Sequence, residues 1–430
     1  MPTCALITLG CKVNQWDTEA LREDLERRGF VEVAPSEPAD LYVVNTCCVT
    51  HESHRKSVRH VRRLARAHPG AALVVVGCSV EHSAEAFLAI PGVGCVGTNA
   101  EKPGIGAVAA RLVGLEGTPA EPAEASQWPS ISRFAGHTRA FVKVEDGCND
   151  FCSYCIVPHV RGRVRSRPPD EVAAEVTRLV ANGYREVVLT GIHLGAYGLG
   201  TEGQWTLGAL VRRLTATPGL QRLRLSSLEL REVSDELIEL AAASHVLCPH
   251  FHIPLQSGDD AVLHAMNRRY TGADYLARVD AIRRRIDDAA ITADAIVGFP
   301  GETDEQFRHT IALARQAAFG RMHVFPYSDR EGTPAASMPH KTPRAVIKER
   351  RAEMLGVAAE LATAYHRRFV GRTVEPLIEN SRDHRTGLLV GYTERYVRVF
   401  LDGPDELLGR IVPVRVTETL ARGVRGEGGT

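Results

Sequence analysis

The sequence lacks the features that mark membrane, secreted and strongly charged proteins. No apolar run approaches the ~20 residues that a membrane-spanning helix needs, so we expect no membrane partner. The 52 basic and 52 acidic residues cancel, which argues neither for nor against a nucleic-acid partner. The first residues, Met1-Pro2-Thr3-Cys4, lead directly into an apolar run without the pattern of a secretory signal. These absences leave a soluble, ordinary globular protein.

Cysteine, by contrast, is plentiful, with ten residues in a chain of 430. Without a secretory signal, these cysteines indicate a reducing cytoplasm, where clustered thiols are metal ligands more often than disulfides. The length allows about two to four domains with well-buried cores. We therefore expect a cytoplasmic protein of several domains that binds metal.

The cysteines are densest at Cys148, Cys152 and Cys155, which have the spacing Cys-x3-Cys-x2-Cys. Thiolates are soft ligands that select zinc, copper(I) or iron–sulfur clusters. Three protein ligands on a four-iron cluster would leave one iron open to an exogenous ligand, and an open position implies chemistry. The alternative is a structural zinc site with His159 as the fourth ligand. The long βα array that follows favours the cluster.

Residues 4–112 alternate short apolar runs with helical patterns, which predicts a doubly wound parallel sheet. The expected strands are Cys4–Leu9, Leu41–Asn45, Leu73–Val76 and Val93–Val96. Each of the first three strands is followed at once by a cysteine, namely Cys11, Cys47 and Cys78. Parallel strands end at one sheet edge, so these thiols are expected to converge on a second metal site, an iron–sulfur cluster in preference to zinc.

The other four cysteines lack this placement and are assigned structural roles; they are Cys4, Cys48, Cys95 and Cys248. Any single cysteine after a strand could also be a small buried hydrophobe. Identical placement after three successive strands is what favours a shared ligand set.

Residues 115–133 are rich in Pro, Ala, Glu and Ser without periodicity, which predicts a linker. From Phe134 to about Tyr365 the βα alternation resumes, and six strands with intervening helices predict a partial (β/α)6 barrel. The expected strands are Phe141–Val144, Glu186–Leu189, Arg222–Leu225, His250–Ile253, Ile291–Val297 and Met322–Phe325. Polar or Gly-rich segments follow five of them, which predicts a ligand-filled mouth at the carboxyl ends of the strands.

Two segments carry unopposed basic charge. Residues 53–68 hold six Lys/Arg and no acid, which fits either a solvated helix face or a contact with a phosphate backbone. Arg161, Arg163, Arg165 and Arg167 alternate, and on an extended segment all four would face one way. A basic rim for a phosphate-bearing substrate is the preferred interpretation, and a salt-bridged loop is the alternative.

The last part of the chain changes character. Residues 341–372 are helical and basic, with eight Lys/Arg against three acids. From Thr373 onwards short strands alternate with turns, which predicts a small β-barrel. The expected strands are Val374–Glu379, Gly387–Tyr392, Tyr396–Leu401 and Ile411–Val416. Such a terminal barrel commonly binds nucleic acid.

Several motifs together resemble one family over nearly the whole chain. They are Gly10-Cys11-Lys12-Val13-Asn14-Gln15, Asn45-Thr46-Cys47, Gly77-Cys78 and residues 147–162 (GCNDFCSYCIVPHVRG). Their order is similar to that of the radical S-adenosylmethionine (SAM) methylthiotransferases, with a three-cysteine domain, a radical-SAM core and a TRAM-like barrel. GCKVNQ and FCSYCIVP are most similar to the bacterial branch that acts on N6-threonylcarbamoyladenosine (t6A) in tRNA. The isopentenyladenosine branch usually has GCQMN at the first cysteine, and the ribosomal-protein branch GCPKN.

The resemblance implies an enzyme with two [4Fe–4S] clusters that replaces the C2 hydrogen of the adenine with a methylthio group. The cluster that binds SAM and cleaves it to a 5′-deoxyadenosyl radical would be held by Cys148, Cys152 and Cys155. The auxiliary cluster, whose open iron carries the sulfur, would be held by Cys11, Cys47 and Cys78. One SAM would supply the methyl group and another the radical. The expected SAM pocket comprises Glu229, Gln256, Ser257, Gly298 and Tyr327.

The resemblance also implies a separate role for each part of the chain. Residues 1–114 would carry the auxiliary cluster, 115–133 would be a linker, 134–368 the radical-SAM core and 369–430 a TRAM-like RNA-binding barrel. The partner would be the anticodon stem-loop of tRNA, whose target base can be splayed out of the stack. The electron donor and the sulfur source are not identified.

Three alternatives stay open at this stage. The same scaffold could modify isopentenyladenosine in tRNA or a ribosomal protein side chain, and the cysteines could form zinc sites in an RNA-binding protein. One departure from the family pattern is His54, which stands where an acidic residue is expected before Arg55-Lys56. Whether Lys12, Asn14 or His54 contacts the threonylcarbamoyl group is also open.

Overall fold

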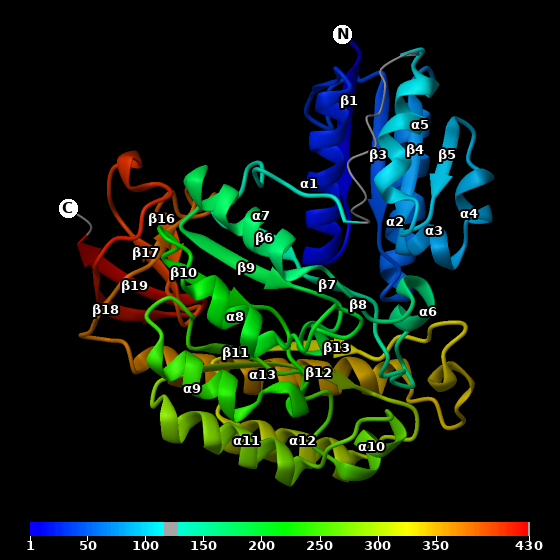
Figure 1. The fold of residues 1–430 in the computed structure, drawn as a ribbon. Coiled ribbons are helices and arrows are strands. Elements are labelled where there is room, and N and C mark those ends of the chain that lie inside the picture. The colour runs from blue at the N-terminus through cyan, green and yellow to red at the C-terminus, as the bar shows by residue number, and fades with distance from the viewer. Residues whose placement is uncertain (116–127, 429–430) are drawn as a thin grey trace.

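The computed structural model describes residues 1–115 and 128–428. Figure 1 shows an N-terminal α/β unit at the upper right, a curled C-terminal sheet at the left, and an arc of strands and helices below them. The predicted linker falls mostly on residues 116–127, which lie outside the described residues. In the described ranges, no helix is long and apolar enough to cross a membrane.

The N-terminal unit is a parallel sheet with the strand order β2-β1-β3-β4-β5. Its strands are β1 (Thr3–Thr8), β2 (Val31–Glu32), β3 (Leu41–Thr46), β4 (Ala72–Gly77) and β5 (Val93–Gly97). Strand β3 is buried at all six positions, as expected for a central strand covered on both faces.

Helices cover both faces of this sheet. Helices α1 (Lys12–Arg27) and α5 (Ile105–Leu112) pack against one face, where Leu6 and Val43 point. Helices α2 (His51–Ala67) and α4 (Glu85–Leu88) pack against the other face, where Ala5 and Val44 point. A short helix α3 (Cys78–His82) continues directly from β4. The predicted doubly wound sheet is confirmed.

The central part is an arc of six parallel strands. They are β6 (Ala140–Lys143), β9 (Glu186–Thr190), β10 (Arg222–Leu225), β11 (His250–His252), β12 (Ala290–Val297) and β13 (Arg321–Pro326). Two three-stranded sheets, β6-β9-β10 and β11-β12-β13, are joined by isolated bridges such as Ser227–His252. This arrangement confirms the predicted partial barrel.

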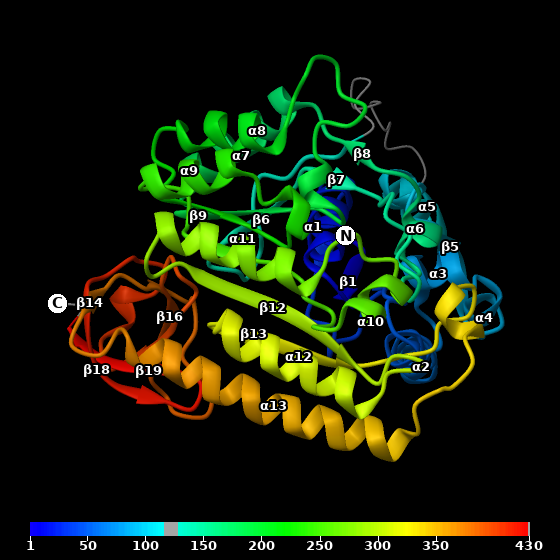
Figure 2. The same ribbon diagram turned by 90° about the horizontal axis from the view of Figure 1, so that it is seen from below.

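The helices of the arc lie on its outer side (Figure 2). They are α7 (Pro169–Ala181), α8 (Leu207–Thr215), α9 (Asp235–Ala243), α10 (Asp260–Ala265), α11 (Gly272–Arg285) and α12 (Asp304–Ala317). Between β6 and α7 the chain forms the short strands β7 (Glu145–Asp146) and β8 (Arg165–Ser166) and helix α6 (Val157–Arg161). One apolar core joins the strands and helices of the arc and also takes in Trp16 of α1.

Helix α13 (Arg344–Arg367) runs along the arc into the C-terminal sheet (Figure 2). The order of this sheet is β14-β18-β19-β17-β16-β15, and it curls around an apolar core. Its strands are β14 (Thr373–Val374), β15 (Leu377–Ile378), β16 (Leu389–Tyr392), β17 (Arg398–Leu401), β18 (Val414–Leu420) and β19 (Gly423–Gly428). The predicted terminal β unit is confirmed, but β19 was not predicted because its three glycines hide the strand alternation.

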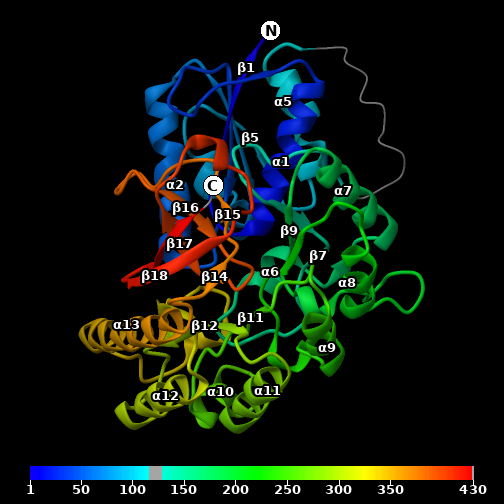
Figure 3. The ribbon, with the colours of Figure 1, turned by 90° about the vertical axis from the view of Figure 1, so that its left-hand side faces the viewer.

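Figure 3 shows the C-terminal sheet next to the arc. Arg222 and Arg224 of β10 donate to backbone carbonyls of the C-terminal unit. The Arg224 guanidinium donates to the backbone carbonyls of Thr393 at 3.1 Å and Glu394 at 2.8 Å. Tyr396 has a left-handed backbone with φ of 62°, and its ring stacks on His250 at 5.1 Å between ring centres. The loop before β17 therefore reaches the inside of the arc.

Candidate functional site

A cavity of about 780 Å³ opens between the inside of the arc and the carboxyl edge of the N-terminal sheet. Cys11 and Lys12 line it from the N-terminal sheet, and Tyr396 lines it from the C-terminal sheet. The cysteine loop contributes Cys148, Cys152 and Cys155. All three parts of the fold thus contribute to one chamber.

The loop that carries Cys148, Cys152 and Cys155 is fixed by close backbone contacts. Gly147 has φ of 90°, and a Cβ there would lie 2.1 Å from the carbonyl oxygen of Arg163, so only glycine fits. The amide of Asp150 donates to the Cys148 sulfur at 3.4 Å, and the Arg268 guanidinium donates to the Cys152 sulfur at 3.5 Å. Donors aimed at sulfur suit thiolates that ligate a cluster.

The three sulfurs of the cysteine loop do not all lie within 4.8 Å of one another. Tetrahedral zinc brings its sulfur ligands to about 3.8 Å from one another, given Zn–S bonds of ~2.3 Å. Among the described residues, the one group of His, Cys, Asp or Glu ligand atoms within 4.8 Å of each other is Cys148, Asp150 and His193. His159 lies outside that group and is exposed, with its ring against Phe151 at 5.7 Å. The three thiols and His159 are therefore not gathered as a Cys3His zinc site requires.

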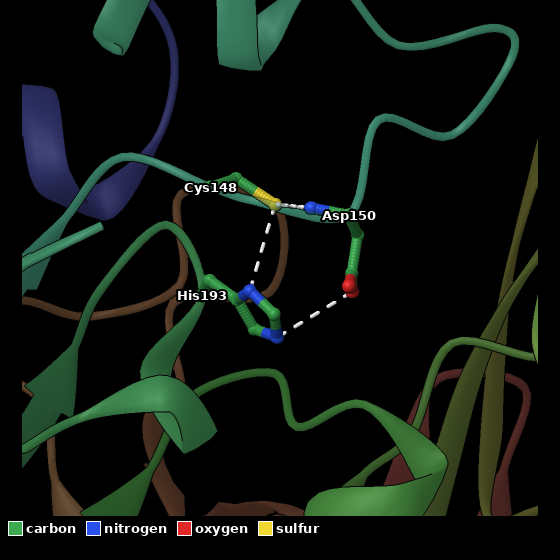
Figure 4. Close-up of side chains that lie close together, drawn as sticks. All are labelled: Cys148, Asp150 and His193. Carbon is green, nitrogen blue, oxygen red and sulfur yellow. Dashed lines mark hydrogen bonds and ion pairs between the residues drawn. The ribbon is translucent and has the colours of Figure 1, made fainter. Parts of the chain in front are cut away.

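Figure 4 shows His193 directed between Cys148 and Asp150. Its Nδ1 lies 3.6 Å from the Cys148 sulfur, and its Nε2 lies 3.5 Å from an Asp150 oxygen and also pairs with Glu232. Burial opposes the charge of His193, but Cys148 and Glu232 outweigh it and raise its pKa to about 11. His193 thus holds the first cysteine of the loop in place.

The other three predicted ligands follow neighbouring strands. Cys11 caps α1 and is exposed to the cavity, whereas Cys47 and Cys78 lie behind it and are buried. A Cβ at Gly10 would lie 2.7 Å from the Cys47 Cβ, which shows how closely the first two segments approach. Burial, with smaller contributions from Cys78 and Cys11, raises the pKa of the Cys47 thiol to about 11. The structure therefore brings these cysteines to one sheet edge, as predicted.

Arg161 links the two groups of cysteines. Its Nε donates to the Cys78 sulfur at 3.2 Å, and its Nη1 donates to Asp146 at 3.0 Å. Its side chain is 1% exposed. Since Cys78 belongs to the N-terminal sheet and Arg161 ends the helix after the cysteine loop, this side chain fixes one cysteine group relative to the other.

A buried ion network surrounds this contact. Asp17 pairs with Lys102 at 2.7 Å and with Lys143 at 2.8 Å, and Asp146 pairs with Lys143 at 2.6 Å. With Arg161, three cations face two carboxylates, so the network carries one uncompensated positive charge. Burial opposes ionisation of Asp17, but Lys102, Lys143 and Arg161 hold its pKa well below the ordinary value.

The predicted basic rim is wrong for two of its four arginines. Arg161 is in the network described above, and Arg167 is buried against Glu175 at 2.9 Å. Arg163 and Arg165 are exposed. The segment is not uniformly extended, because α6 ends at Arg161 and Gly162 turns the chain with φ of 74°.

The expected SAM pocket is only partly assembled at the cavity. Glu229 and Gln256 line it, and Glu229 accepts from Arg268 at 3.0 Å. Ser257 is fully buried and bonds to Thr310 at 3.2 Å. Gly298 packs against Ile347, and Tyr327 bonds to Asp329, so the structure does not place either of them in the cavity wall. All five residues follow the ends of strands, as predicted, and Glu229 and Gln256 are the two of them that line the cavity.

The three residues considered for contact with the threonylcarbamoyl group, Lys12, Asn14 and His54, lie in different surroundings. Lys12 lines the cavity. Asn14 is 1% exposed and donates to the carbonyl oxygens of Leu9 and Thr46, so it holds the strand ends together. His54 bonds to Ser79 at 2.5 Å and lines a separate groove along α2.

Polar residues on the inner face of the arc were missed by the sequence analysis. They alternate along β10 to β13, and those that line the cavity are Arg224, His250, His252, Thr292, Asp294, Arg321 and His323. Their signal was the polar alternation within each expected strand, which marks one face of a sheet. It was hidden because inward positions of a barrel are usually apolar.

Comparison with known proteins agrees with this architecture. Residues 142–314 match the Radical SAM superfamily, residues 3–96 the Uncharacterized protein family UPF0004, and residues 367–427 the TRAM domain. Among solved structures, the radical S-adenosylmethionine methyltransferase TsrM from Kitasatospora setae aligns with a TM-score of 0.56 at 16% identity. That alignment covers 78% of this chain and 74% of TsrM and supports the fold.

Curated relatives match over nearly the whole chain. The Threonylcarbamoyladenosine tRNA methylthiotransferase MtaB of Bacillus subtilis is 36% identical over 426 residues, covering 97% of this chain and 94% of that protein. The tRNA-2-methylthio-N(6)-dimethylallyladenosine synthase of Desulfitobacterium hafniense is 35% identical over 430 residues, covering 98% and 96%. With its six cysteines gathered as described, the chain belongs to the radical SAM tRNA methylthiotransferase family, whose cofactors are SAM and [4Fe–4S] clusters.

Proposed function

We propose that this enzyme replaces the C2 hydrogen of t6A, next to the anticodon of tRNA, with a methylthio group, using two SAM and two [4Fe–4S] clusters. The observation that carries the proposal is that Cys11 and the loop of Cys148, Cys152 and Cys155 line one cavity. Relatives named for t6A come from Bacillus subtilis, Chlamydia pneumoniae and Thermotoga maritima, at 35–37% identity.

Each cysteine group has a proposed role. Cys148, Cys152 and Cys155 hold the cluster that binds SAM, with Glu229 and Gln256 beside them. The auxiliary cluster is held by Cys11, Cys47 and Cys78. When bound, these cofactors supply radical C–H activation, a methyl group and the sulfur.

The protein's own contribution is positioning and exclusion of water. Arg268 and Arg161 donate to cysteine sulfurs, so they orient the two ligand groups and offset their negative charge. The cavity walls come from three parts of the fold and enclose the target base once it is splayed from the anticodon loop. We assign residues 1–114 to the auxiliary site, 134–368 to the radical-SAM core and 369–430 to RNA binding, in a cytoplasmic protein.

The proposal is tested by mass spectrometry of tRNA nucleosides from cells with and without the gene. We expect the 2-methylthio derivative of t6A to disappear on deletion and to return with the wild-type gene. If 2-methylthio-isopentenyladenosine disappears instead, the substrate assignment is wrong, although the reaction type stands. If no tRNA nucleoside changes, tRNA is not the substrate.

Helix α2 is a candidate surface for the tRNA backbone. Its N-cap Thr50 accepts from the Ser53 amide at 3.0 Å, and its outer face carries six exposed cations. Arg55 and Arg59 have Glu52 nearby, at 3.9 and 3.2 Å, but Glu52 is a single charge against six. A groove of about 830 Å³ runs beside this face. The excess of exposed positive charge favours a phosphate contact over a merely solvated face.

Neutralising the cations of α2 should therefore weaken tRNA binding without altering the cavity. For the triple variant we expect the slope of log K against log salt to fall by about 0.7–0.9 for each lost phosphate contact. Fluorescence anisotropy at several salt concentrations measures this slope. The substitutions are Arg59→Gln, Arg62→Gln and Arg66→Gln. The matched control removes three exposed arginines from the outer helices α8 and α11, namely Arg212→Gln, Arg284→Gln and Arg285→Gln. Equal losses in both variants would show that α2 has no specific part in binding.

A further inference from the structure

The charged residues of the cavity are mostly paired. Glu229 pairs with Arg268, Asp294 with His252 at 3.2 Å, and Asp150 with Arg231. Arg224 is also satisfied, because it pairs with the buried Glu186 at 2.9 Å and donates to two backbone carbonyls of the C-terminal sheet. Because each of these charges already has a partner, none of them requires a charged ligand.

Two cations of the cavity differ from the rest. Lys12 and Arg321 both line it, and within the described ranges neither forms an ion pair with a carboxylate. Lys12 lies over the Phe141 ring at 6.0 Å, and Arg321, at the start of β13, is exposed. They come from opposite walls, since Lys12 follows Cys11 on the N-terminal sheet and Arg321 belongs to the arc.

The two cations act on the same part of the cavity. Burial is the main cause of the lowered pKa of His250, followed by Arg224 and His252 and then by Lys12 and Arg321. The pKa of His323 is lowered by burial and then by Arg321, with a smaller contribution from Lys12 and an opposing one from Asp294. The two rings are therefore neutral at pH 7, and the positive charge of this region resides on Lys12 and Arg321. A ligand that fills the region needs a negative group to balance them.

We propose that Lys12 and Arg321 bind the carboxylate of the threonylcarbamoyl group and thereby select t6A over adenosines with apolar N6 substituents. The inference rests on the function proposed above and identifies the part of the site that determines specificity. A carboxylate matches two unpaired cations that line one cavity, because it can accept charge-assisted hydrogen bonds from both. A dimethylallyl group offers no acceptor and would leave both charges uncompensated inside the cavity.

The test compares anticodon stem-loop RNA carrying t6A with the same RNA carrying the t6A methyl ester, which is neutral. For Arg321→Gln and for Lys12→Gln, we expect kcat/KM on t6A RNA to fall about tenfold or more each, as for loss of a hydrogen bond to a charged group. On the ester RNA the variants should equal the wild type. The matched control is Arg111→Gln, which removes one exposed charge from α5, outside the cavity lining. It should leave kcat/KM unchanged on both the t6A RNA and the ester RNA.

A second readout is independent of the clusters. Binding of both RNAs to the metal-free protein, followed by fluorescence anisotropy, should show the same preference for t6A in the wild type and its loss in Arg321→Gln. This variant is the decisive one, because Lys12 adjoins the proposed ligand Cys11 and its replacement could disturb the auxiliary site. Iron and sulfide content is measured for each variant.

The outcomes separate the alternatives. Equal losses on t6A and ester RNA would place the two cations against RNA phosphates and overturn the proposal, and unchanged kinetics would overturn it as well. If the wild-type enzyme modifies isopentenyladenosine RNA but not t6A RNA, the proposed function itself fails. A loss confined to t6A RNA supports both.

Discussion

Replacing Cys152 by alanine is expected to abolish SAM cleavage, whereas replacing Cys78 is expected to leave cleavage intact and stop methylthiolation. Cys152 lines the cavity beside Glu229 and Arg268, where SAM is proposed to bind. Cys78 is buried behind Cys11 and contacts Arg161 instead. The two thiols therefore belong to different sites, and their loss should separate the two half-reactions.

The measurement follows 5′-deoxyadenosine and the 2-methylthio nucleoside in the same reaction, with iron content determined for each protein. Each variant should lose about half of its iron, because it loses one cluster of two. The control is Cys95→Ala on β5, which removes a thiol that does not line the cavity and should retain both products. Full product formation by Cys78→Ala would refute the assignment of the auxiliary site.

Replacing Arg161 by methionine is expected to destabilise the contact between the N-terminal sheet and the cysteine loop by ~3–5 kcal/mol, the usual cost of removing one member of a buried ion network. Asp146 would lose the Nη1 donor that both of its oxygens share, and Cys78 would lose its donor. Burial also disfavours the charge of Arg161, but Asp146, Cys78 and Asp17 outweigh it and raise its pKa well above the ordinary value. In the Arg161→Met variant this position is uncharged, so Asp146 and Asp17 lose a buried cation that balances their charge.

Hydrogen exchange in α1 and α6 measures the local opening free energy, which suits a chain of several folding units better than one global transition. The matched control is Arg163→Met, two residues away but exposed, which should change stability by less than about 0.5 kcal/mol. Similar effects of both substitutions would mean that the buried network contributes little to domain contact.

Much of the architecture could be predicted because it depends on periodic patterns. Runs such as Leu73–Val76 are apolar and β-branched, and β4 lies at that place. The convergence of Cys11, Cys47 and Cys78 also followed from sequence, since parallel strands end at a common edge. Strand β19 escaped prediction because Gly423 and Gly426 fit where a Cβ would strike the backbone of a neighbouring strand.

The candidate site was less predictable, because a residue's place at a strand end does not fix where its side chain points. Gln256 and Ser257 are neighbours, yet one lines the cavity and the other faces the core. Arg161 was expected at a basic rim, but a helix and the turn at Gly162 direct it into the interior. The polar alternation along β13 marks the face to which Arg321 belongs, but its proposed role depends on Lys12, which is distant in the chain.

The contact of Tyr396 with His250 has a consequence for how the enzyme can be divided. Tyr396 belongs to the C-terminal unit, yet it lines the same chamber as Cys148, Cys152 and Cys155. A fragment without the C-terminal sheet would therefore lack part of the cavity wall as well as the RNA-binding unit. The boundary between these two parts is not a boundary between their functions.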